Sequence, residues 1–108
     1  MTHLNNNRGM DITKNIKMIE WLKSELLSAT AHLFKSLING SEEMILDALS
    51  NIIIVCYLLA KRLGLSYSRI DLNMESKIMM NIKRGHEAEK WYGDLSDLYQ
   101  FLRGNREI

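Results

Sequence analysis

The residue types best suited to chemistry in this chain are polar side chains placed three or four residues apart in two segments. Glu25, Ser28 and His32 share the first segment, and Glu43, Asp47 and Asn51 share the second. These steps put side chains on one face of a helix, so two antiparallel helices could bring the polar faces together in a small acidic pocket. Carboxylate oxygens are the ligands that Mg²⁺ prefers. We therefore predict a metal site built from Glu25, His32 and Asp47, with Glu43 and Asn51 assisting.

Each of these residues also has an interpretation that involves no ligand. Glu43 lies in the first turn of a predicted helix, where a carboxylate suits the helix dipole. A lone histidine on a helix, such as His32, is more often packed or exposed than metal-bound. Asn51 could hydrogen-bond across a dimer axis and fix its register. Asp47 is harder to dismiss, because a mid-helix aspartate has poor helix propensity and needs water or a partner.

The elements that must position these residues are predicted to be helices. The chain has no proline, few glycines, and apolar residues that repeat at three and four. We expect helices over 11–37 with Asp11 as N-cap, over 42–63 capped by Ser41, over about 68–85, and a short one capped by Asp94 or Asp97. Gly40 should end the first helix in a left-handed conformation. The predicted organisation is a disordered tail over 1–10, one all-α domain of about four helices over 11–103, and a tail over 104–108.

Residues 52–60, "IIIVCYLLA", are apolar on every side of the predicted second helix. A bilayer span needs about 20 such residues, so we expect a buried helix and no membrane partner. The other helices of one chain can cover only part of it, which predicts a homo-oligomer, a dimer or a tetramer. Cys56 lies in this run and is predicted to be a small buried side chain.

The charge balance and the cysteine count narrow the function further. Lys and Arg number 14 against 13 Asp and Glu, which argues against a nucleic acid partner held by net charge, although a local basic patch stays open. One cysteine and no apolar leader favour a cytoplasmic location.

A second group of candidates follows the predicted second helix. Lys77, Lys83 and Arg84, with His86, could contact phosphate oxygens, or could be solvated charges at a helix end. Trp91 and Tyr92 could stack on a nucleobase, or could anchor the C-terminal segment to the bundle.

The segment "FKSLINGSEEMILDALSNIIIVCYLLAKRLGLSYSRIDLNMESKIMMNIKRG" resembles the core of the MazG-like proteins, and the resemblance covers about residues 20–85. The resemblance implies an oligomeric helical bundle that cleaves nucleoside triphosphates, NTP or dNTP, into monophosphate and pyrophosphate with Mg²⁺ or Mn²⁺. In that family a Glu-Glu-x-x-Glu motif and a Glu-x-x-Asp motif hold the metal. The matching positions here are Ser28, Ala29 and His32 in the first helix, and Ala48 and Asn51 in the second. Because none of them is acidic, three functions stay open. The chain could be a pyrophosphohydrolase with reduced or lost activity, an inactive helical dimer that binds a nucleotide or a protein, or a purely structural assembly unit that requires no ligand.

Overall fold

A computed structural model describes residues 2–107 of the chain, and the side chains of residues 11–104. The described residues form five helices and no strand, which confirms the all-α fold class. The chain divides into two compact units, one ending at Leu65 and the other beginning at Ser66, and each is described by itself. The predicted single domain over 11–103 stays a prediction.

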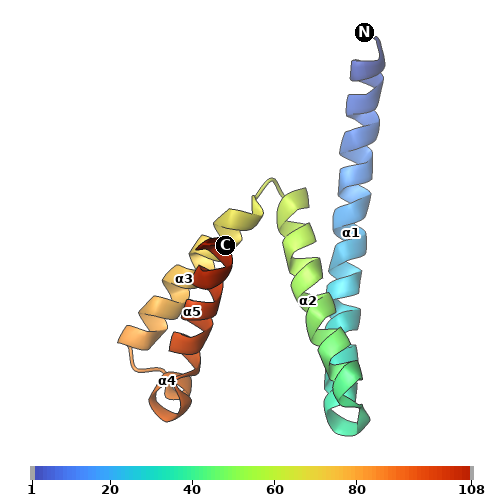
Figure 1. Ribbon diagram of the computed structural model, residues 1–108. Helices are drawn as coiled ribbons and strands as arrows, with labels where there is room; N and C mark the ends of the chain where they lie inside the picture. Colours follow the sequence, from blue (N-terminus) through green and yellow to red (C-terminus); the bar gives the residue numbers. More distant parts are fainter. Residues whose placement is uncertain (1, 108) are drawn as a thin grey trace. The chain divides into compact units, whose positions relative to one another are not determined.

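The first unit is a hairpin of two antiparallel helices, α1 (Thr2–Asn39) and α2 (Glu42–Arg62) (Figure 1). α1 is longer than predicted, because it begins at Thr2 and Asp11 lies inside it rather than capping it. No proline interrupts residues 2–10, and the one glycine there, Gly9, costs a helix only about 1 kcal/mol. The composition of residues 2–10 resembles that of a disordered tail, but the helix continues through them.

A tight turn joins the two helices. Ser41 caps α2 as predicted, since its hydroxyl accepts a hydrogen bond from the Met44 N–H at 3.2 Å. Gly40 differs from the prediction, because the glycines with positive φ are Gly64, Gly85 and Gly93. Its N–H donates to the Ser36 carbonyl at 2.7 Å, and a Cβ at position 40 would lie 2.6 Å from that same oxygen. Gly40 is thus required by close packing and not by a left-handed backbone.

The contact between α1 and α2 is narrow. Leu22 of α1 and the small residues Ala48, Val55 and Ala60 of α2 are buried there. At the open end of the hairpin, the Asn15 side-chain amide donates to the Arg62 carbonyl at 2.9 Å and satisfies an oxygen of the last turn of α2.

Four of the nine residues in the apolar run 52–60 are exposed. Ile53, Ile54 and Leu58 are exposed, which agrees with the expectation that one neighbouring helix cannot shield the run. Cys56 is exposed as well, so the prediction that it is buried is wrong: it lies on a side of α2 that α1 does not reach. Among the described helices, α2 is long and apolar enough to cross a membrane, a test that the core helix of a soluble protein also passes.

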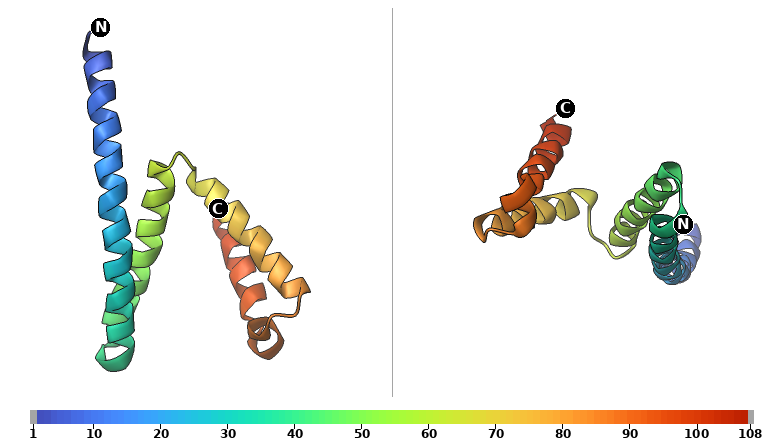
Figure 2. Two further views of the ribbon diagram at one scale, coloured as in Figure 1. Left: turned by 180° about the vertical axis from the view of Figure 1, so that it is seen from behind. Right: turned by 90° about the horizontal axis from the view of Figure 1, so that it is seen from below.

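The second unit contains α3 (Tyr67–Lys83), α4 (Glu87–Tyr92) and α5 (Asp94–Glu107). α3 and α5 pack side by side and antiparallel (Figure 2), with Ile78 buried on α3. The sequence predicted no helix at 87–92, because six residues are too few to show an apolar period.

Trp91 and Tyr92, the aromatic pair at the end of α4, are largely exposed. Trp91 is 68% exposed and Tyr92 is 71% exposed, and their rings contact each other edge to face with centroids 6.3 Å apart. Their exposure does not support the anchoring alternative within this unit, and stacking on a nucleobase stays a prediction.

Candidate functional site

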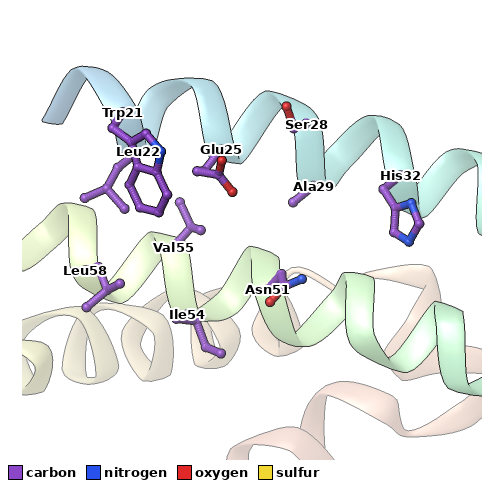
Figure 3. Close-up of a pocket in the computed structure, with 10 residues that line it drawn as sticks. All are labelled: Trp21, Leu22, Glu25, Ser28, Ala29, His32, Asn51, Ile54, Val55 and Leu58. Carbon is purple, nitrogen blue, oxygen red and sulfur yellow. The ribbon is translucent and has the colours of Figure 1, made fainter. Parts of the chain in front are cut away.

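One flank of the α1–α2 hairpin carries an open pocket of about 340 Å³. Its walls come from both helices, as Figure 3 shows. The polar lining residues are Glu25, Ser28, His32 and Asn51, and the apolar ones are Trp21, Leu22, Ala29, Ile54, Val55 and Leu58. This volume is at the lower end of the range typical of small-molecule sites.

The polar residues of the pocket follow the predicted face of α1. Glu25 and His32 extend from α1 toward α2, and Asn51 lies across from them on α2 (Figure 3). Glu25 is half-buried, whereas Ser28, His32 and Asn51 are exposed. The pocket thus offers one carboxylate, one hydroxyl, one imidazole and one amide, a set that can hydrogen-bond a polar ligand at several points.

Trp21 is a member of this site that the sequence analysis did not name. It precedes Glu25 by four residues, and its ring extends from α1 toward α2 beside Leu22 and Val55 (Figure 3). The helical step from Trp21 through Glu25 and Ser28 to His32 was the signal that could have identified it. A large aromatic face next to polar groups suits a planar, partly apolar ligand.

Two of the predicted ligands are not part of the pocket. Glu43 and Asp47 are exposed on α2 and do not line it. Asp47 lies about one turn and Glu43 about two turns closer to the hairpin turn than Asn51. The structure therefore brings together Glu25, His32 and Asn51 but not the whole predicted set.

The donors in the pocket do not fit a magnesium site of the kind that the sequence predicted. Mg²⁺ takes oxygen ligands in near-octahedral geometry and is held by carboxylates, and the pocket has one. Among the described residues, no three His, Cys, Asp or Glu side chains are grouped so that they could hold a metal ion. A ligand role for Glu25, His32, Glu43, Asp47 and Asn51 stays a prediction.

The basic candidates belong to the second unit. Lys77 and Lys83 are exposed on α3, and Arg84 is its exposed C-cap residue. His86 has a structural contact, because its Nδ1 accepts a hydrogen bond from the Ala88 N–H at 3.1 Å and caps α4.

Comparison with known proteins gives one match. The sequence model of the MazG-like family matches residues 12–95. No curated protein and no solved structure matches the chain. The match includes the whole pocket and both segments to which the resemblance assigns metal ligands, the positions Ser28, Ala29, His32, Ala48 and Asn51. Four of these positions line the pocket, and the fifth, Ala48, is buried between the helices.

Proposed function

Because the chain belongs to the MazG-like family, we propose that it is a nucleoside triphosphate pyrophosphohydrolase-type protein that binds its nucleotide in the α1–α2 pocket. The observation that supports this most is the position of the pocket. It forms around the residues that correspond to the family's metal ligands, although the residue types have changed. The resemblance matches the family's carboxylate positions to Ser28, Ala29, His32 and Asn51, and these four residues line the cavity.

The reaction of this type cleaves a nucleoside triphosphate between its α and β phosphates. Water attacks the α phosphorus, the bond from that phosphorus to the bridging oxygen breaks, and the products are a nucleoside monophosphate and pyrophosphate. Glu25 is the one carboxylate that lines the pocket, so it is the side chain that can accept the proton of the water. Trp21 would contact the base. A phosphate-contacting role for Lys77, Lys83 and Arg84, which lie in the second unit, stays a prediction from the sequence.

We expect turnover well below that of a site with a full carboxylate set. The family is metal-dependent in general, so Mg²⁺ or Mn²⁺ is the cofactor that membership implies. Each missing carboxylate removes a direct electrostatic contribution to cation binding. Loss of metal affinity then lowers the rate even where the nucleotide still binds.

A second candidate function is a catalytically inactive helical dimer that binds a nucleotide or a protein. The neutral residues at the ligand positions and the exposed apolar residues of α2 favour it. Both candidates include a homo-oligomer in the cytoplasm, as the apolar run and the single cysteine predict.

A nucleotide panel separates these functions. The full-length chain is incubated with each NTP and dNTP, with Mg²⁺, with Mn²⁺ and with EDTA, and both pyrophosphate and monophosphate are measured. In parallel, the shift in Tm with each nucleotide reports binding without turnover. Glu25→Gln is the test variant, and Glu20→Gln, an exposed carboxylate on the same helix outside the pocket, is its matched control.

Slow turnover that Glu25→Gln abolishes and Glu20→Gln leaves unchanged would support the enzyme. A nucleotide-dependent rise in Tm with no products would support the inactive binder. Turnover that survives Asp47→Asn combined with Glu25→Gln would exclude both residues as ligands. A chain that neither shifts its Tm nor forms products with any nucleotide would overturn the enzyme and the nucleotide-binding dimer, and would leave the protein-binding dimer as the candidate.

A further inference from the structure

The exposed side of α3 carries a continuous positive face with no acidic residue on it. Its members, all exposed, are Arg69, Asn73, Ser76, Lys77, Met80, Lys83 and Arg84, and we call this set the α3 cationic face. At 100° per residue, the steps of four, eight and fifteen from Arg69 to Asn73, Lys77 and Arg84 stay within about 80° of one another. The face extends about 22 Å along the helix at 1.5 Å per residue.

The acidic residues of α3 are on its other side. Asp71 is half-buried and Glu75 is buried, in the direction of the apolar residues that pack in the second unit. Among the described residues, no ion pair involves Arg69, Lys77 or Arg84. The whole chain is nearly neutral, but in α3 the basic residues lie on one side of the helix and the acidic residues on the other.

Helix stability does not account for this arrangement. Lys83 and Arg84 lie at the C-terminal end of α3, where cations suit the helix dipole. Arg69 lies in the first turn, where the dipole disfavours a cation and where α3 has no acidic residue to balance it. Lys77 is in the middle of the helix, where the dipole has little effect. A ligand with repeated negative charges explains all four positions.

A fifth cation lies at the C-terminal end of the same helix. A Cβ at Gly85 would lie 2.9 Å from Cε of Lys90 and 3.5 Å from its Nζ, so the Lys90 side chain passes directly over Gly85. Gly85 follows Arg84 and has a φ of 72°. The positive charge of the face thus continues past the helix onto the α3–α4 turn.

We propose that the α3 cationic face binds the phosphate backbone of a nucleic acid without reading its sequence. The length of the face exceeds what one triphosphate can contact, and repeated phosphates match repeated cations. Asn73 and Ser76 can donate additional hydrogen bonds to phosphate oxygens. The face presents no aromatic side chain on which a base could stack, so contacts to the backbone should dominate.

A membrane surface fits this face less well. A basic helix that lies on a bilayer inserts its apolar side, but the apolar side of α3 packs with α5 and contains the buried Ile78. The exposed side is mostly polar, with Met80 within the face and Leu72 at its edge as the apolar exceptions. This inference does not rest on the proposed function, because it concerns a different unit of the chain and a polymer instead of a free nucleotide.

The test measures fluorescence anisotropy of a labelled 20-nucleotide single-stranded RNA and of a labelled DNA duplex at several salt concentrations. The test variant combines Arg69→Glu, Lys77→Glu and Arg84→Glu. The matched control combines Lys14→Glu, Lys17→Glu and Lys35→Glu, three exposed residues of α1, so both variants have the same net charge. Circular dichroism checks that each is folded, and Lys77→Gln combined with Arg84→Gln replaces the test variant if it is not.

We expect the test variant to raise Kd at least tenfold and the control to change Kd less than threefold. The slope of log K against log salt for the single strand should lose about two units, since three phosphate contacts contribute about 0.7 each. Oligonucleotides of different sequence should bind alike. Equal losses in both variants would overturn the proposal, and so would binding to anionic phosphatidylserine vesicles or to free ATP without binding to either polymer. Failure here leaves the nucleotide panel unaffected, because that panel reports the α1–α2 pocket.

Discussion

At the scale of single residues, the pocket has the helical spacing of a ligand site but holds one carboxylate. Glu25, Ser28 and His32 line it from α1, and Asn51 lines it from α2. The spacing was readable in the sequence because a helix repeats at a known angle. The extent of the pocket on α2 was not, because it depends on how α1 and α2 pack against each other.

Gly40 is the residue where packing at the hairpin turn can be tested most directly. In Gly40→Ala the new Cβ would lie 2.6 Å from the Ser36 carbonyl oxygen, so the backbone must shift. We expect the free energy of unfolding to fall by about 1–3 kcal/mol. Urea denaturation followed by circular dichroism measures it.

Gly104→Ala is the matched control for this substitution. Its Cβ would meet nothing within 4 Å, and position 104 lies inside α5. Alanine there should raise stability by about 0.5–1 kcal/mol, because glycine loses more backbone entropy in a helix. Equal effects of the two substitutions would contradict the steric account of Gly40.

At the scale of elements, the helices are held by caps that come from their neighbours as well as from their own ends. Ser41 and Ser66 each cap the helix that follows them. α5 is different, because its first turn is satisfied by Glu89 of α4: one carboxylate oxygen accepts from the Ser96 N–H at 3.1 Å and the other from the Ser96 hydroxyl at 2.6 Å. These two hydrogen bonds hold α4 against the first turn of α5.

Glu89→Ala should therefore loosen the second unit. Two hydrogen bonds to a charged acceptor are lost, and we expect the free energy of unfolding to fall by about 1–2 kcal/mol. Amide hydrogen exchange should show faster exchange at Ser96 and its neighbours. Glu87→Ala, also in the first turn of α4 but exposed, removes the same charge and is the control. If Glu87→Ala destabilised the chain as much, the loss would come from the charge and not from the contact with Ser96.

At the scale of the whole molecule, the first unit presents an apolar surface on the side away from the pocket. Leu49 and Leu58 are nine residues apart on α2 and so point in opposite directions. Leu58 lines the pocket and Leu49 does not, yet their exposures are alike at 41% and 43%. The pocket flank of α2 carries the polar residue Asn51, whereas the neighbours of Leu49 on its flank of α2 are the exposed apolar residues Leu46 and Ile53. We expect a second copy of the chain to bind there.

Leu49→Lys should therefore shift the chain from oligomer to monomer, because an apolar interface would remove the water that solvates the lysine charge and offer it no partner. Light scattering at dilutions from about 100 µM to 1 µM measures the mass. Leu58→Lys, on the flank of the pocket, should leave the mass unchanged. A wild-type chain that stays monomeric at the highest concentration would contradict the homo-oligomer.

The sequence by itself determined the class of the fold, the boundaries of α2 and α3 to within a residue or two, and the polar face of α1. These depend on local rules: helical period, caps such as Ser41, and the absence of proline. Only the tertiary structure decided that Glu43 and Asp47 lie outside the pocket, that Trp21 lies inside it, that Cys56 is exposed, and that Gly40 is needed for close approach. The first three depend on how α1 and α2 pack, that is, on distances between residues far apart in the chain, about which a local pattern carries no information. The need for glycine at position 40 depends on the local path of the turn, where a Cβ would meet Ser36.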